Sequence, residues 1–467
     1  MKLKGFYDSH LHLLGLGYVK TMIDLSDYKT IEQVREIKSN KEIIMGRGWH
    51  QNQFIGKRMP TKTDLNAISD TNPIVFIRVC GHVLVCNDKA MEMANIKKDT
   101  PQIEGGTFDF ETGIFTEDAL SIIYNILPKP SKATLKEMLI EGNKELLKNG
   151  ITSCASDDFS TIDVPYELVI ECLEELYNDG LMQVRLYEQV NLPSIELFQD
   201  FIDKGYVNKQ FNGFKMGPLK LLADGSLGGR TAYLNDDYSD ESNNRGIKVF
   251  SDEELYDLIY LADSNNMDVA IHAIGDGIID IILDTIELVT KKTGRVNHRH
   301  SIIHNQLATK KQIKRMTKMN IMAIVQPIFL NSDLAIIEDR MGNRTNETYL
   351  FHTMKEQGMK VGFSTDSPVE PVNPFYNIYT AMTRKSIKNP GLKPLLNETV
   401  FSLKESLKCY TTENYYHSYE ELEAFDDYVI IDKDICITSI EEIKDVSVLE
   451  TYINGTCVYK KEDFNES

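Results

Sequence analysis

Two histidines near the amino terminus have the spacing of a shared metal site. His10 and His12 stand two residues apart in the segment DSHLHL. Side chains alternate between the two faces of a β-strand, so both imidazoles would point the same way if this segment is extended. Neutral imidazoles on one face can coordinate a single metal ion. Such a pair also arises by chance, and surface or core histidines explain it equally well.

Three further residues follow apolar runs in the same way. His272 lies in VAIHAIGD, His304 in SIIHNQ and Asp366 in VGFSTDSP, each at or just beyond the carboxyl end of an expected strand. Taken singly, each has a structural explanation, because a histidine beside a strand can satisfy a local hydrogen bond and an aspartate before Ser-Pro can cap a turn. The recurrence of one placement along the chain favours a shared site.

The elements that would position these residues alternate between strands and helices. Between about residues 150 and 370, the pattern of short apolar runs and amphipathic segments is typical of βα units around a parallel sheet. Ser251 and Glu254 have capping-box spacing at the start of one expected helix. Further helices are expected over 132–149, 164–179 and 309–319, and strands over 4–12, 151–156, 182–189, 214–224, 268–273, 301–304, 321–326 and 360–365.

Eight expected strands are the number that closes a (β/α)8 TIM barrel, in which all carboxyl strand ends meet at one mouth. The stretch 44–130, between the first two strands, is rich in Gly, Pro, Asn and Asp and is expected to be an inserted substrate or lid region. The tail, 401–467, begins helically and then becomes rich in β-branched residues. We therefore predict an α/β barrel over 1–400 with an insertion after its first strand, followed by a reduced C-terminal β-subdomain.

Composition limits the classes of function. The 467 residues include 70 acidic and 51 basic ones, a formal net charge of −19, which disfavours binding to nucleic acid and to anionic membranes. The sequence contains no apolar run of about 18 residues and no signal-peptide core. Its seven cysteines are scattered without a CxxC pair, which is typical of buried thiols in a reducing compartment. We expect a cytoplasmic protein with a small-molecule partner.

Several sequence blocks are more specific than composition. They are GFYDSHLHLLGLG from residue 5, GRGWHQ at 46–51, RVCGHVLVCNDKAM at 78–91, LKLLADGSLGGRTAYL at 219–234, HAIGDG at 272–277, HNQ at 304–306, QP at 326–327 and STDSPVEP at 364–371. Together they resemble the amidohydrolase superfamily, and within it the YtcJ-like branch that also holds N-substituted formamide deformylase. The resemblance extends from residue 5 to about residue 460 and implies a barrel of the metal-dependent hydrolase type.

The resemblance also implies a metal centre. The two amino-terminal histidines would bind the more buried ion, and the two later histidines a second ion. Lys220 would react with CO2 to give a carboxylated lysine that bridges both ions, because a carbamate is an anionic oxygen donor whereas an ammonium is repelled by cations. Outside its sequence block, Lys220 would be interpreted as an ordinary salt-bridge lysine. The implied ligands are His10, His12, Lys220, His272, His304 and Asp366.

Zinc suits these ligands, with one or two ions per chain, although iron, manganese or nickel would fit the same set.

Four further residues are candidates for substrate binding. His82 lies in a block that resembles a substrate-facing loop of the family. The alternative interpretation is that His82 is a loop histidine without a function in binding. Trp49 and Arg78 belong to the insertion and are equally well explained as packing and anchoring residues. Arg230 follows the DGSLGG turn.

The implied activity is that of an amidohydrolase acting on a carbon–nitrogen bond other than a peptide bond. A metal-activated hydroxide would attack the amide-type bond of a small molecule, with Asp366 as general base. Hydrolysis of an ester, lactone or cyclic imide, or deamination, stays open because the fold and the metal site do not determine the bond. A catalytically idle scaffold is a further alternative, and it would tolerate loss of the ligands.

The sequence departs from the family pattern at its amino terminus. Only four residues precede the GFYDSHLH block, where the family has several strands of a β-sandwich. The strands of the tail would therefore pair in another way, or the partner subunit of a homodimer would cover their edge. Around His304, this chain has Ile303 and Asn305 where the family usually has Glu and Ala, and Ser364 stands where Gly is commoner.

Overall fold

The chain folds into two units, which are described separately. The computed structural model describes residues 1–462 with the exception of 79–80, 82, 104, 118 and 421. The larger unit comprises Met1–Leu16 and Gly142–Ser467, and the second unit comprises Gly17–Glu141. Two helices, α1 (Leu13–Thr21) and α6 (Lys132–Lys148), run across the boundaries between the units.

Eight strands form the central sheet of the larger unit, in the order β15-β14-β13-β12-β11-β10-β9-β2. Every neighbouring pair is parallel. The strands are buried along most of their length, which explains why they were visible in the sequence as short apolar runs. They are β2 (Phe6–Leu11), β9 (Ile151–Ser156), β10 (Arg185–Val190), β11 (Phe214–Leu222), β12 (Val269–Ala273), β13 (Ser301–His304), β14 (Met322–Val325) and β15 (Val361–Phe363).

The first and last strands of this sheet meet. The main-chain N–H of Asp366, just beyond β15, donates to the carbonyl oxygen of His10 at 3.0 Å. The hydroxyl of Ser9 donates to the carbonyl oxygen of Phe363, also at 3.0 Å. The sheet is therefore nearly closed, and it confirms the predicted (β/α)8 barrel.

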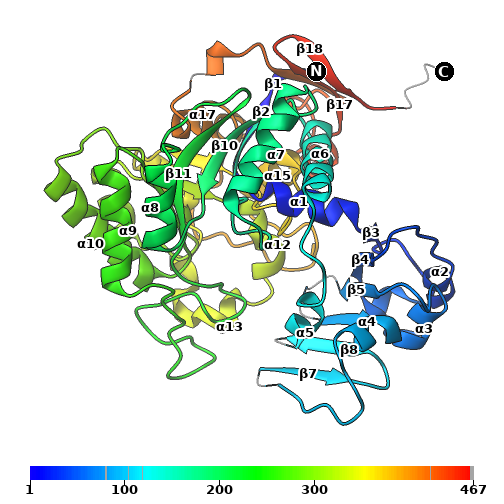
Figure 1. The fold of residues 1–467 in the computed structure, drawn as a ribbon. Coiled ribbons are helices and arrows are strands. Elements are labelled where there is room, and N and C mark those ends of the chain that lie inside the picture. The colour runs from blue at the N-terminus through cyan, green and yellow to red at the C-terminus, as the bar shows by residue number, and fades with distance from the viewer. Residues whose placement is uncertain (79–80, 82, 104, 118, 421, 463–467) are drawn as a thin grey trace. The chain divides into compact units, whose positions relative to one another are not determined.

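Helices of the larger unit lie around the outside of the strands (Figure 1). Helix α9 begins with the predicted capping box, in which the Ser251 side chain accepts from Glu254 N and the Glu254 side chain accepts from Ser251 N. The helices are α7 (Tyr166–Asn178), α8 (Ile195–Asp203), α9 (Asp252–Ser264), α10 (Asp276–Thr293), α11 (Lys310–Lys318), α12 (Leu330–Asp333), α13 (Ile337–Met341), α14 (Phe351–Glu356), α15 (Pro374–Thr383), α16 (Leu403–Cys409) and α17 (Thr412–His417), with short 3-10 turns at Pro327–Phe329, Gly342–Glu347, Leu422–Ala424 and Ile440–Asp445.

A small antiparallel sheet joins the two ends of the chain, in the order β1-β16-β17-β18. The amino-terminal residues that precede the barrel form β1 and pair with β16, so the strands of the tail pair with the chain's own start (Figure 1). Strands β1 and β18 are the edges of this sheet, and the predicted homodimer stays a prediction. The strands are β1 (Lys2–Lys4), β16 (Tyr428–Ile431), β17 (Val448–Ile453) and β18 (Thr456–Lys460).

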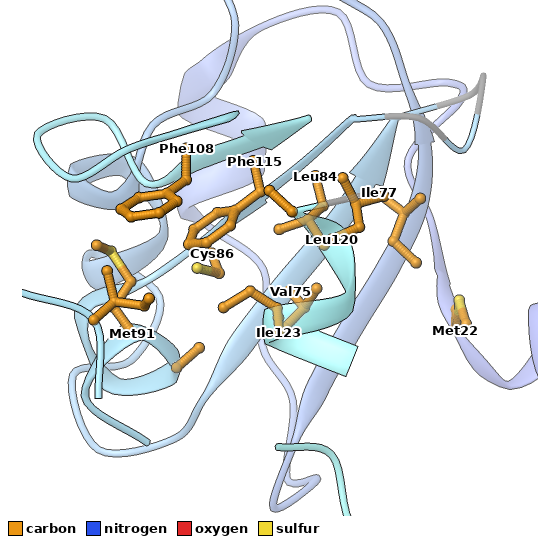
Figure 2. Packing of buried hydrophobic residues seen from close by; sticks show 13 residues of the cluster. Met22, Val75, Ile77, Leu84, Cys86, Met91, Phe108, Phe115, Leu120 and Ile123 are labelled. Carbon is orange, nitrogen blue, oxygen red and sulfur yellow. The ribbon is translucent and has the colours of Figure 1, made fainter. Parts of the chain in front are cut away.

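The second unit has its own sheet and its own core. Its six strands have the order β3-β4-β5-β6-β8-β7. Figure 2 shows one face of the core, where Phe108 and Phe115 stack with ring centroids 5.4 Å apart, close to Cys86 and Leu84. The elements are β3 (Ile23–Asp24), α2 (Ile31–Arg35), β4 (Ile44–Trp49), a 3-10 turn (Gln51–Gln53), α3 (Lys62–Asn66), β5 (Ile74–Arg78), β6 (Val83–Cys86), α4 (Asp88–Met93), β7 (Gly106–Asp109), β8 (Ile114–Glu117) and α5 (Leu120–Tyr124).

Two sequence-level expectations on partners and thiols can be compared with the fold. None of the helices formed by the described residues combines the length and the apolar character that crossing a membrane requires. Buried thiols were predicted, but Cys436 and Cys457 are exposed. Cys436 lies in a turn after β16, and Cys457 lies on the edge strand β18, where one face meets solvent. The thiols of Cys86, Cys154, Cys172 and Cys409 are buried.

Candidate metal centre

Three of the predicted ligands converge at the mouth of the barrel. His10 lies on β2, His12 follows its end, and Asp366 follows β15. The Nε2 atoms of His10 and His12 lie 3.2 and 3.1 Å from the same atom, Oδ1 of Asp366. One ligand atom from each residue lies within 4.8 Å of the other two. The alternation of side chains along β2 and the junction between β2 and β15 together produce this cluster.

The two later histidines adjoin this cluster. His272 on β12 and His304 at the end of β13 have ring centroids 4.3 Å apart, and His304 lies 5.9 Å from the ring of His10. The backbones of His304 and Asp366 are in the left-handed region, with φ of 78° and 56°. This conformation is uncommon for residues other than glycine and is found more often at functional sites.

Acceptors on one ring nitrogen orient three of the imidazoles. Nδ1 of His10 donates to Oε1 of Gln189 at 2.5 Å, and Nδ1 of His12 donates to the carbonyl oxygen of Asp157 at 3.0 Å. Nδ1 of His304 contacts Oε1 of Gln326 at 2.8 Å. Because these acceptors hold Nδ1, Nε2 is the nitrogen that each of the three rings could offer to a metal ion, and at His12 this requires loss of the proton shared with Asp366.

His272 has the opposite arrangement. Its Nε2 donates to the carbonyl oxygen of Gly225 at 3.0 Å and lies 3.4 Å from Oδ1 of Asp224. Nδ1 is therefore the nitrogen of His272 with a lone pair available for an ion. Asp224 is itself held by the main-chain N–H groups of Ile274 and Gly275, which donate to its carboxylate at 3.0 and 2.8 Å.

Lys220 lies on β11 and is buried, with 1% of its surface exposed. Its Nζ is 3.4 Å from Oδ2 of Asp157, whose side chain is also buried. In this ion pair Lys220 is an ammonium. A carbamate at the same place would be an anion beside a carboxylate, so it would require the positive charge of bound metal.

The electrostatics of the site separate one ion pair from neutral imidazoles. Burial would lower the pKa of His12, but the hydrogen bond to Asp366 and its charge outweigh burial and raise that pKa to about 9. Burial would raise the pKa of Asp366, but the imidazoles of His10 and His12 beside its Oδ1 hold that pKa well below its ordinary value. At His10 and His304 burial dominates and lowers the pKa. Both rings are then neutral, which is the form that binds metal.

A buried aspartate that sequence reasoning missed joins the two strands bearing His10 and Asp366. The carboxylate of Asp8 on β2 accepts from the hydroxyl of Thr365 at 2.6 Å and from its main-chain N–H at 3.1 Å. Burial raises the pKa of Asp8 to about 7. Gln189 was missed as well, since a single glutamine at a strand end carries no local signal. Gln326 belongs to the QP block and could have been found there.

Three of the four candidate substrate-binding residues have contacts within their own unit that the structure describes, and their role in binding substrate stays a prediction. Trp49 is fully buried in the core of the second unit, and its Nε1 donates to the carbonyl oxygen of Phe76 at 3.0 Å. Nε of Arg78 donates to Oε1 of Gln51 in the same unit. In the larger unit, Arg230 donates twice to Asp240, at 3.1 and 2.9 Å. His82 lies outside the described residues.

A cavity of about 630 Å³ lies at the opposite end of the barrel, beside the amino ends of β11 to β13. The charged groups that line it are paired with neighbouring side chains. Arg295 donates to Asp268 at 2.7 Å, Tyr419 donates to the same carboxylate at 2.5 Å, and Lys215 lies 3.4 Å from Glu420. This cavity contains none of the six predicted ligands, so the polar cluster at the mouth, and not the cavity, identifies the site.

Replacing Gln326 with leucine is expected to weaken zinc binding by about 10–100-fold, the usual cost of losing a partner that orients a metal-bound histidine. The leucine would leave Nδ1 of His304 without its acceptor. Competition with a chelator measures the affinity. Gln312→Leu is the matched control, because Gln312 is equally buried but caps α11 and donates to the carbonyl oxygen of Asp276. Unchanged affinity in Gln326→Leu would contradict the role of His304 as a ligand.

Comparison with known proteins places this arrangement in context. A sequence profile described as the amidohydrolase family matches residues 4–459. YtcJ of Bacillus subtilis (strain 168), whose name assigns it to the amidohydrolases, is 30% identical over 483 residues, covering 98% of this chain and 88% of YtcJ. N-substituted formamide deformylase of Arthrobacter pascens is 22% identical with the same coverage. An uncharacterized metal-dependent hydrolase from Pyrococcus horikoshii OT3 superposes with a TM-score of 0.77 at 30% identity, over 94% of this chain and 87% of that one.

Proposed function

The chain belongs to the amidohydrolase family, as its sequence blocks predicted, and from this premise we propose that it hydrolyses a carbon–nitrogen bond other than a peptide bond in a small molecule. The observation that supports the proposal most directly is the convergence of His10, His12 and Asp366, whose ligand atoms lie within 4.8 Å of one another. The proposed metal ligands are His10, His12, Lys220, His272, His304 and Asp366.

The donor set fits one or two divalent ions. In each of the four imidazoles a protein acceptor holds one ring nitrogen, which leaves the other nitrogen as the candidate ligand atom, and Asp366 adds a buried carboxylate. Imidazole and carboxylate are the ligands of hydrolytic zinc sites. We propose zinc as the ion, and a carbamate on Lys220 as the oxygen donor between two ions.

The chain's own residues would position the reactants and move one proton. An ion held here would acidify a bound water and polarise the carbonyl oxygen of the substrate. Asp366 takes the proton of the attacking water and delivers it to the departing nitrogen. One carbon–oxygen bond forms and one carbon–nitrogen bond breaks, so the acid and the amine are the products.

Metal content per chain tests the proposal. Protein purified without chelator and supplied with zinc and bicarbonate is expected to hold about two ions per chain, because a bridging carbamate would bind two ions. Parallel samples prepared without bicarbonate and CO2 are expected to hold less zinc, because the uncharged or protonated amine of Lys220 cannot bridge two cations. N-formyl and N-acyl compounds are then screened beside esters, lactones, cyclic imides and aminated heterocycles.

The outcomes separate the alternatives. A value near one ion that is independent of bicarbonate would keep the hydrolase and remove the carbamate on Lys220. Turnover of esters or aminated rings, but not of N-acyl compounds, would replace the proposed bond. A value near zero after repeated reconstitution would overturn the proposed metal hydrolase and favour a scaffold.

A further inference from the structure

Asp157 is a buried carboxylate at the end of the second barrel strand, and it contacts two of the proposed ligands. Its carbonyl oxygen accepts from Nδ1 of His12 at 3.0 Å. Its side-chain Oδ2 lies 3.4 Å from Nζ of Lys220 and accepts from Nδ2 of Asn191 at 3.1 Å. Only 2% of the residue is exposed. Its place after β9, next to β2, brings it to the same mouth as His10 and His12.

The other side-chain oxygen of Asp157 is buried without a hydrogen-bond partner. A buried polar atom without a partner is costly and calls for an explanation, of which an ion is one. The next residue provides a comparison inside the same segment. In Asp158, Oδ1 accepts from Leu14 N at 2.7 Å and Oδ2 accepts from the Ser156 hydroxyl, also at 2.7 Å. The barrel therefore satisfies both oxygens of one aspartate and leaves one oxygen of its neighbour free.

Two other carboxylates among the described residues have a buried oxygen without a partner, and their surroundings differ. Glu413 lies near Lys355 and Lys360, away from the barrel mouth. Glu188 accepts from Asp158 N, and burial raises its pKa well above the ordinary value, which favours its uncharged form. Of the three, Asp157 is the one paired with Lys220.

The charge of the site also favours a further anion. The proposed ligands include four imidazoles, which bring no negative charge when neutral. Two divalent ions in a buried site would leave a net positive charge with Asp366 and one carbamate alone, and such a charge is unfavourable away from water. A carboxylate oxygen is a ligand for zinc, manganese and iron alike.

We propose that Asp157 is a seventh ligand of the metal centre, whose free Oδ1 binds the ion while Oδ2 keeps its hydrogen bond from Asn191. The inference rests on the proposed function, because it requires a metal-binding chain. It goes beyond the sequence blocks, since none of them includes residue 157.

Asp157→Asn tests this ligand in the full-length chain. Zinc affinity, measured by competition with a chelator, is expected to fall by about 10–100-fold or more, at least as much as the loss of an outer partner costs. With Co²⁺ in place of zinc, the visible absorption of the bound ion is expected to change, because the ligand set around the cobalt changes. Asp158→Asn is the matched control and is expected to leave both readouts as in the unsubstituted protein. Thermal unfolding of the metal-free variants shows whether each one folds.

Each outcome decides the inference. Unchanged zinc affinity in Asp157→Asn would overturn it, and so would a fall in affinity with an unchanged cobalt spectrum, which would make Asp157 a positioning residue for Lys220. If Asp157→Asn fails to fold, Asp157→Glu takes its place, and the cobalt spectrum is expected to shift there too. Absence of zinc from the unsubstituted protein would overturn the proposed function itself, so the two failures are distinguishable.

Discussion

Asp366→Asn is expected to retain bound zinc but to lower kcat by about 10²–10⁴-fold, the range that a general acid–base contributes. The asparagine keeps the size of the side chain and one oxygen close to His10 and His12, which lie 3.2 and 3.1 Å from Oδ1. It cannot accept the proton of the attacking water. Zinc per chain and steady-state kinetics on the N-acyl compound that the unsubstituted protein turns over fastest are the two measurements.

A buried aspartate far from the mouth is the control for damage to the fold. Asp263 on α9 binds Arg295 Nη1 at 3.0 Å and the Thr293 hydroxyl at 2.6 Å. Asp263→Asn is expected to lower the unfolding temperature without lowering kcat of the folded protein, because these contacts stabilise the barrel and touch no proposed ligand. Near-native turnover in Asp366→Asn would show that another group carries the proton.

His10→Ala is expected to abolish zinc-dependent activity and to weaken zinc binding by more than the roughly 10–100-fold that loss of an outer partner costs. His10 is 1% exposed and contacts both Gln189 and Asp366, so alanine removes a proposed ligand and one contact of each of these neighbours. Elemental analysis and chelator competition measure the loss. Chelation of the unsubstituted protein is expected to reproduce the inactivity, and added zinc to reverse it.

Another buried histidine distinguishes loss of a ligand from loss of packing. His298 stacks on His300 with ring centroids 4.2 Å apart, just before β13 and away from the mouth. His298→Ala is expected to keep its zinc and its activity in the folded fraction. Full zinc occupancy with normal affinity in His10→Ala would remove His10 from the metal centre.

The strands of the barrel could be located from the sequence because their signal is local. Runs such as 151–156 and 301–304 are short, apolar and bounded by polar residues, and they match β9 and β13. The capping box at Ser251 is equally local and was confirmed. The extent of the second unit was less accessible. The insertion was expected over 44–130, whereas contacts assign Gly17–Glu141 to this unit. These contacts include the pairing of β3 with β4, and a strand of two residues such as β3 has no recognisable pattern in the sequence.

The sequence by itself determined the barrel and the family, and it predicted five candidate ligands at or just beyond strand ends, because periodicity and motif spacing are properties of neighbouring residues. Lys220 was added to them by the resemblance of its sequence block. The tertiary structure alone decided which nitrogen of each imidazole faces the site. That choice depends on Gln189, Gln326 and Gly225, which are distant in sequence from the histidines that they contact. The same holds for the free oxygen of Asp157 beside Lys220, since a buried oxygen without a hydrogen-bond partner exists only once the barrel has closed around it.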